Sequence, residues 1–384
     1  MPFSLGRHML SILTILLISC AESRYDVSAV TRIRIDENTP MSPITTSDLF
    51  TNASMVALET KPGSLISEIY KIVEYNNNYF LEDKFAASTL LSFGKNGKFV
   101  MQYGHKGIGP GDYTLPMDFG IDPVKSEVLV LNSEEHKLNF YDLASGNFKR
   151  EKPYLLPFHE FVKTKKGYVV GGAARQRRII FCDSNLIPTK QLIDYRPVLG
   201  MGIFNKFITL DSLTLFRLSL HDTVYSVLED DIKPYLVVDF GRQAFHDSDY
   251  QKISDVQQQR LYEYIADKKT NIAMYAENAD SRIFSFDYKR ERYICVQDKS
   301  SLHFKIFNGK NISDNVFFLT DFPMIVGTDK SGHFLFTVTS SRYLAAKEKM
   351  NKAAQGSMYA KLSVSDSISN LSNPILGKFK ISKF

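Results

Sequence analysis

The chain is built from short runs of β-forming residues, and polar turns separate almost every run from the next. Examples are Asn78–Glu82, Thr89–Phe93 and Glu127–Leu131, with turns such as Lys95-Asn96-Gly97 and Ser145-Gly146 between runs. The 28 Phe and 20 Tyr residues suit such strands, because aromatic side chains pack well on a pleated surface. Many short strands at close, regular spacing predict an antiparallel all-β fold, not one that alternates strands with helices.

A longer unit recurs along these runs. Each copy has a strand, a polar turn, a second strand, a short gap and a third strand that ends near an aromatic residue. The clearest copies span residues 69–104, 117–151 and 159–191, and weaker copies begin near Phe207, Arg282 and Asn315. Six copies with a period of about 40 to 50 residues fit the blades of a β-propeller. Radial repetition protects strand edges, so the sequence predicts a six-bladed β-propeller.

Two stretches break the β pattern and predict short helical insertions between strands. Asp247–Lys268 has apolar residues at roughly helical spacing, with Asp247 or Ser248 as its N-cap, and Arg342–Met358 is rich in Ala and Lys. The second stretch carries the densest basic cluster of the chain, interrupted only by Glu348. We interpret that cluster as a solvated helix face, with a contact to a membrane or partner as the alternative: Arg342, Lys347, Lys349 and Lys352.

The first nineteen residues have the features of an export signal. The apolar stretch Met9–Ile18 is too short to cross a bilayer, which needs about 20 residues, and it fits the core of a signal peptide. Leu17-Ile18-Ser19-Cys20 resembles the bacterial lipobox, in which the Cys thiol takes a diacylglycerol and the new N-terminal amine is usually acylated too. Two or more acyl chains anchor a protein stably. We predict a signal peptide over 1–19, lipidation of Cys20, a tether over 20–40 and the propeller over 41–384; a simple secretory signal with an incidental Cys is the alternative.

The chain from about residue 50 to 384 resembles a known family. Residues 104–148 resemble an NHL-type blade, and three segments carry the wider likeness to six-bladed β-propeller lipoproteins (NHL-like or TolB-like) of Gram-negative gut and oral anaerobes. These segments are Gly107–Tyr113, Asp222–Gly241 and Asn373–Ile381. The resemblance implies the fold and a lipid-anchored place in the cell envelope, in the outer membrane at its periplasmic or surface face. Residues 30–60 match only loosely, so we expect a terminal strand to complete a blade from the other end of the chain.

The Gly-rich stretch from Gly104 to Gly111 invites comparison with a phosphate-binding loop. The spacing fails, because the pattern that starts at Gly107 needs Gly where Asp112 stands, and a β-type run follows where a helix N-terminus is required. We predict a tight turn between blades that uses glycine for positive φ.

Metal and thiol chemistry have weak support. No two His residues have i, i+2 or i, i+4 spacing, and Asp247-Ser248-Asp249 begins like a calcium loop but continues with Gln251 and Lys252. We predict no metal site and no cofactor, although a propeller can form an ion-binding site at its channel mouth from one residue per blade. Cys182 and Cys295 are predicted to be buried free thiols, with a disulfide between them as the alternative.

Three short patterns resemble the Asp-[Ser/Thr]-aliphatic acceptor used for O-glycosylation of exported proteins in the same bacterial group. They make Ser212, Thr223 and Ser367 candidate modification sites, although Asp222-Thr223 also reads as a turn into a strand.

The balance of 47 Lys and Arg against 42 Asp and Glu is too mild and dispersed for a nucleic-acid partner. The sequence therefore predicts a non-enzymatic binding or scaffold protein, held at the membrane by its N-terminal lipid, whose propeller holds a peptide, glycan or protein partner. The alternative, from the wider six-bladed propellers, is a metal-dependent lactonase, lyase or hydrolase with its site at the channel mouth.

Overall fold

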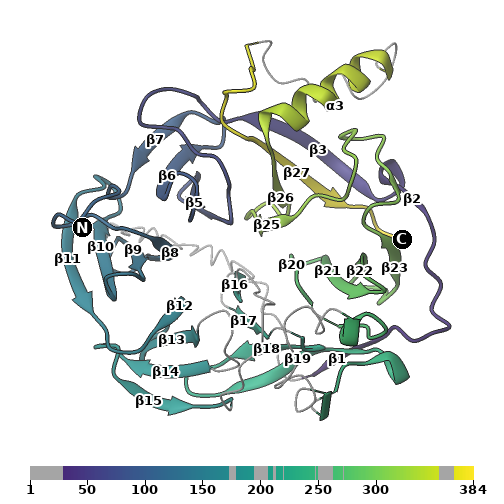
Figure 1. The fold of residues 1–384 in the computed structure, drawn as a ribbon, viewed down its shortest axis with the longest axis horizontal. Helices are drawn as coiled ribbons and strands as arrows, with labels where there is room; N and C mark the ends of the chain where they lie inside the picture. Colours follow the sequence, from purple (N-terminus) through teal and green to yellow (C-terminus); the bar gives the residue numbers. More distant parts are fainter. Residues whose placement is uncertain are drawn as a thin grey trace, which may run out of the picture.

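The computed structural model describes residues 29–172, 179–193, 206–210, 213–218, 220–246, 248–249, 263–270, 272–353 and 367–384. Six sheets, each with four antiparallel strands and one with an added fifth, are arranged around a central axis (Figure 1), which confirms the predicted all-β, six-bladed propeller.

The first three blades follow one another along the chain. Blade 1 consists of β4 (Lys71–Tyr75), β5 (Asn78–Asp83), β6 (Thr89–Gly94) and β7 (Phe99–Gln102). Blade 2 consists of β8 (Pro116–Asp122), β9 (Glu127–Asn132), β10 (Lys137–Asp142) and β11 (Phe148–Pro153). Blade 3 consists of β12 (Phe158–Lys163), β13 (Gly167–Gly172), β14 (Ile179–Asp183) and β15 (Pro188–Gln191).

The second half of the ring uses strands from both ends of the chain. Blade 4 consists of β16 (Phe207–Leu210), β17 (Leu213–Arg217), β18 (Thr223–Val227) and β19 (Ile232–Asp239). Blade 5 consists of β20 (Tyr275–Glu277), β21 (Ser281–Tyr288), β22 (Glu291–Asp298) and β23 (Phe304–Asn308). Blade 6 consists of β25 (Ile325–Thr328), β26 (Phe334–Val338), β27 (Ile375–Ile381) and, from the N-terminal part of the chain, β3 (Phe50–Ala57).

Strand β3 closes the ring. It pairs antiparallel with β27, from Ile375 opposite Ala57 to Ile381 opposite Phe50. The Phe50 ring stacks on the ring of Phe379 with centroids 3.9 Å apart. The expectation that a terminal strand completes a blade from the other end of the chain is confirmed.

The folded chain also reaches into the range assigned to the tether. Strand β1 (Thr31–Arg34) adds to the outer edge of blade 4 by pairing in parallel with β19. Ile33 is 2% exposed and Ile35 is fully buried, so burial of apolar side chains explains why this stretch folds. A short parallel pair, β2 (Ile44–Thr45) with β24 (Ile312–Ser313), follows it, and 3-10 helices η1 (Thr46–Asp48) and η2 (Gly241–Gln243) lie in connections.

The apolar core lies between the blades. Each of the six neighbouring pairs of blades encloses its own cluster of buried side chains. Between blades 1 and 2, for example, Phe80 and Leu90 pack with Phe119 and Val130. The blades are therefore held to one another by packing around the whole ring.

The connections define two faces of the molecule. Turns between the first and second strands, and between the third and fourth, lie at one end, which we call the turn face. The opposite end, the loop face, carries the connections between blades and the loops between second and third strands. Helix α3 (Ser340–Ala353) is inserted there between β26 and β27 (Figure 1). It covers most of the predicted helix and buries Tyr343, Ala346 and Met350, leaving the basic residues mainly on its outer side.

Two of the predicted repeats begin in the wrong place. Arg282 lies in β21, the second strand of blade 5, and Asn315 lies in the loop before β25, the first strand of blade 6. The run 315–319 is not a strand, because the Asp314 carboxylate accepts the backbone N–H groups of Val316, Phe317 and Leu319 and curls the chain. The other predicted helix, 247–268, lies largely outside the described residues, and those described at its two ends, 248–249 and 263–265, are helical.

Several local predictions have a clear outcome. The Gly-rich stretch is a turn between β7 and β8, with positive φ at Gly104 and Gly111, as predicted. Cys182 and Cys295 are buried and unpaired, as predicted. Within the described part of the chain, no helix is long and apolar enough to cross a membrane.

Candidate functional site

Among the described residues, a central channel encloses a volume of about 2240 Å³. The first strand of every blade contributes to its wall, and one lining residue from each of blades 1 to 6 in turn is Val73, Ile121, Phe161, Thr209, Ala276 and Ile325. Its lining extends from Ser67 near the loop face to Lys125 near the turn face. A space of this size accommodates a ligand larger than a typical small molecule.

The wall near the loop face is held by a charged contact across three blades. Lys71 Nζ of blade 1 lies 2.7 Å from the Asp118 carboxylate of blade 2 and donates to the Phe119 carbonyl at 2.7 Å. The other Asp118 oxygen accepts the backbone N–H of Phe161 in blade 3 at 2.8 Å. This contact fixes the first strands of three blades relative to one another.

A group of charged side chains is buried behind this wall. Glu82 and Lys84 are fully buried, with 3.5 Å between Lys84 Nζ and the Glu82 carboxylate. Lys206 Nζ donates to the Gly172 carbonyl and Arg217 to the Ile272 carbonyl, and the Glu160 carboxylate accepts the backbone N–H of Lys206. Burial raises the pKa of Glu82 to about 7, and neither of its carboxylate oxygens has a hydrogen-bond donor among the described residues.

Sequence reasoning missed this buried group, although the repeats contain a signal for it. At or near the start of four successive first strands, one charged residue directly precedes an apolar one: Lys71-Ile72, Asp118-Phe119, Glu160-Phe161 and Lys206-Phe207. A charge at the same place in four repeats points to the channel axis, because the first strand of each blade faces that axis.

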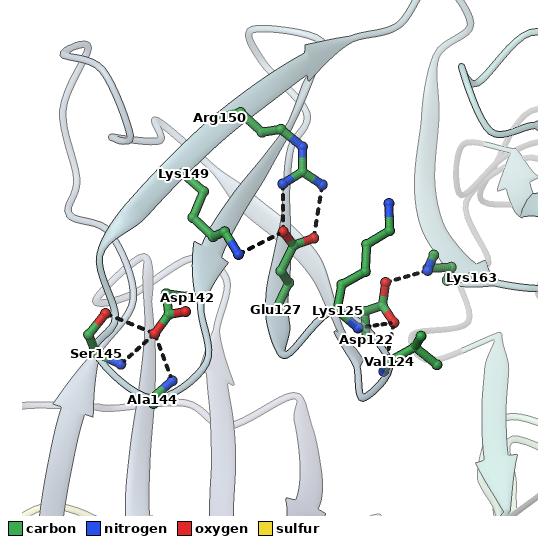
Figure 2. Close-up of polar contacts among 10 residues, drawn as sticks. All are labelled: Asp122, Val124, Lys125, Glu127, Asp142, Ala144, Ser145, Lys149, Arg150 and Lys163. Carbon is green, nitrogen blue, oxygen red and sulfur yellow. Dashed lines mark hydrogen bonds and ion pairs between the residues drawn. The ribbon is translucent and has the colours of Figure 1, made fainter.

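At the turn face, blades 2 and 3 present paired charges (Figure 2). Arg150 donates two hydrogen bonds to the Glu127 carboxylate, at 2.6 and 2.8 Å, and Lys149 lies 3.1 Å from the same carboxylate. These partners, Arg150 first, lower the pKa of Glu127 to about 2. Lys163 of blade 3 pairs with Asp122 of blade 2. Both carboxylates are only 3% exposed, so each cation is held against a buried anion.

Two further cations lie beside these pairs. Lys125 lies in the turn between β8 and β9, and Lys152 of β11 donates to the Ser184 carbonyl of blade 3. Burial, together with nearby Arg150 and Lys125, lowers the pKa of Lys152. Four of the cations that line the channel here form what we call the basic mouth: Lys125, Arg150, Lys152 and Lys163.

Across the channel, blades 5, 6 and 1 carry more balanced charges. Glu277 is fully buried and accepts from Lys299 at 2.5 Å and from Tyr235 at 2.6 Å. Asp329 lies 3.0 Å from His333 Nδ1. Positive charge therefore gathers on the side of blades 2 and 3.

The residues singled out in the sequence are scattered. Cys20 and Ser212 lie outside the described residues. Thr223 begins β18, is 7% exposed and donates its hydroxyl to Asp222 at 2.8 Å, whereas Ser367 is exposed in a turn. Neither Thr223 nor Ser367 lines the channel, and modification at these positions stays a prediction. The described part of the chain contains no group of three or more His, Cys, Asp or Glu side chains arranged to hold a metal ion.

The ring closure and the channel define a six-bladed β-propeller in which both ends of the chain share the last blade. The chain belongs to the family described as a domain of unknown function, DUF4934, whose model matches residues 30–380.

Two solved structures and one curated protein are similar to it. A Bacteroides fragilis protein described as exported is 20% identical, covers 92% of this chain and 100% of its own, and has a TM-score of 0.71. A Bacteroides vulgatus member of the DUF4221 family is 11% identical, covers 88% and 98%, and has a TM-score of 0.49. A Xenopus laevis peptidyl-glycine alpha-amidating monooxygenase A is 26% identical over 78 residues, which are 19% of this chain and 8% of that protein's length.

Proposed function

We propose that this protein is a lipid-anchored scaffold of the bacterial cell envelope that binds a peptide, glycan or protein partner in its channel without converting it. The observation that carries the proposal is a wide channel in which the carboxylates of blade 2 are already paired with cations. Asp118, Asp122 and Glu127 each have a cation and are each at most 3% exposed. A wall of this kind is preorganised for recognition, whereas general acid–base catalysis needs a group free to exchange protons with the substrate.

The lipid anchor is supported by the lipobox-like segment Leu17-Ile18-Ser19-Cys20. The similar Bacteroides fragilis protein is described as exported, which agrees with an envelope location. In the native host, the wild-type protein should take up labelled fatty acid and partition into detergent, and Cys20→Ser should do neither. Detergent partitioning of Cys20→Ser at the wild-type level would contradict the anchor.

Ligand binding in the channel has its own test. The full-length protein, purified in mild detergent and immobilised, is exposed to fractionated peptides and glycans from the host envelope. Thr209 is an exposed channel-lining residue, so Thr209→Trp should narrow the channel and weaken retention. Thr51→Trp, on the outermost strand of blade 6, is the matched control and should leave retention unchanged. Equal retention by both variants would contradict a channel site, and release of a converted ligand would contradict the non-enzymatic part of the proposal.

A further inference from the structure

The cations around the basic mouth outnumber the carboxylates that neutralise them. Glu127 is shared by Arg150 and Lys149, and Asp122 is used by Lys163. The nearby Asp183 carboxylate accepts the backbone N–H groups of Asn185 and Ile187. Among the described residues, neither Lys125 nor Lys152 has a carboxylate within ion-pair distance.

The Arg150 guanidinium and the backbone that carries Lys125 are held in place before any ligand arrives. The Arg150 guanidinium lies 4.0 Å from the centre of the Phe140 ring, in addition to its two hydrogen bonds with Glu127. The turn that carries Lys125 is fixed because Asp122 accepts the backbone N–H groups of Val124 and Lys125 at 3.1 and 3.2 Å. Figure 2 shows the Lys125 side chain rising between the Glu127–Arg150 pair and the Asp122–Lys163 pair.

The Arg150 guanidinium has N–H donors that Glu127 does not use. Arginine has five N–H donors, and Glu127 accepts from one on each terminal nitrogen. Lys125 adds an exposed ammonium. Lys152 adds a half-buried one, whose pKa is lowered first by burial and then by repulsion from its cationic neighbours. A ligand that brings negative charge relieves that repulsion and gains charge-assisted hydrogen bonds.

We propose that the basic mouth binds an oxyanion carried by the channel ligand, a carboxylate, sulfate or phosphate group, through Lys125, Lys152 and the remaining donors of Arg150. This inference rests on the proposed binding function and specifies the chemistry of its ligand. The anion lies at the turn-face end, and the rest of the ligand extends into the channel.

The test uses the full-length protein in non-ionic detergent and three multivalent anions: citrate, tripolyphosphate and a sulfated disaccharide. Isothermal titration calorimetry should show saturable binding of at least one, weaker at physiological than at low ionic strength. The preferred anion identifies the group. Lys125→Gln with Lys152→Gln should weaken binding about tenfold or more, in line with loss of two charge-assisted contacts.

The matched control is Lys166→Gln with Lys190→Gln, because these lysines lie on the same face but near the carboxylates Asp230 and Asp231. The control should bind as the wild type does, and both double variants should keep the wild-type unfolding midpoint. Lack of saturable binding of all three anions, or equal weakening by the control, would overturn the anion site. If envelope ligands are still retained and Thr209→Trp still weakens their retention, the scaffold function stands and only the anion site is wrong.

Discussion

At the scale of residues, a buried ion pair near the loop face, Glu82 with Lys84, changes the pKa of its carboxyl group. Glu82 and Lys84 lie inside the fold with 3.5 Å between ammonium and carboxylate, while Asp118 and Glu160 contribute further negative charge nearby. Removing two charges from water costs several kcal/mol each, and their mutual attraction offsets this only in part. The raised pKa of Glu82, about 7, expresses that cost.

A first prediction follows for Lys84→Met. The folded state holds a proton on Glu82 between its ordinary value of 4.5 and about 7, where the unfolded chain has lost it, so this group's contribution to stability falls as pH rises through that window. Without Lys84 the carboxylate loses its nearest cation, and its pKa rises further. Urea unfolding should show Lys84→Met destabilised by about 3–5 kcal/mol near pH 8 and by clearly less near pH 5.

The double variant Glu82→Gln with Lys84→Met is the control for that measurement. It removes both charges, so the added pH dependence of the single variant should disappear. An equal loss of stability near both pH values in Lys84→Met would show that packing, not the buried charge, sets the cost.

The reactivity of Cys182 and Cys295 tests whether these thiols are buried, and the total number of free thiols tests whether Cys20 carries a lipid. Burial raises the pKa of Cys182 to about 11 and that of Cys295 further still, so neither is a reactive thiolate at neutral pH. The native lipidated protein should not react rapidly with Ellman's reagent, and unfolding without reductant should release the two thiols. An unlipidated chain should release all three cysteines of the sequence, because Cys20 then keeps its thiol. Absence of thiols after unfolding would mean that Cys182 and Cys295 pair.

At the scale of elements, we expect β3, the outermost strand of blade 6, to contribute more to stability than other outermost strands. Phe50 of β3 is 4% exposed and packs against Phe379, Phe317 and Phe322. Phe50→Ala should therefore lower the free energy of unfolding by about 3–5 kcal/mol, measured by urea titration. Phe148→Ala, on the outermost strand of blade 2, starts from a side chain that is 36% exposed and should cost less than half as much. Equal losses would mean that β3 contributes no more than any other edge strand.

Most elements were predictable because period-two patterns and turn residues are local signals. The failures came from interactions that a local pattern does not contain. Val316 and Phe317 are as apolar as a strand, yet Asp314 binds their N–H groups and prevents pairing. Thr31–Arg34 joins blade 4 only because β19, some two hundred residues later, offers its edge. The basic mouth was missed for the same reason, since Lys125, Arg150 and Lys163 come from a turn and two strands of different blades.

At the scale of the whole molecule, the ring has no single central core. Six apolar clusters lie between neighbouring blades, and the centre is a channel. Each blade is stabilised by two neighbours, so the contacts that join the last blade to the first matter as much as any others. Blades 1 and 6 meet through Tyr79, Leu81 and Leu91 on one side and Leu335 and Leu376 on the other.

Closure of the ring can be tested by shortening the chain from its N-terminus. A chain that begins at Ala29 keeps β1 and β3 and should unfold in one cooperative transition. Beginning at Glu37 removes β1 with buried Ile33 and Ile35; the midpoint should fall while the transition stays single, because blade 6 is still complete. Beginning at Glu59 removes β3, exposes the edge of β27 and should give an earlier, broader transition and a larger radius of gyration by X-ray scattering. If the Glu59 chain unfolds like the Glu37 chain, closure by β3 does not hold the ring together, and packing between blades alone is sufficient.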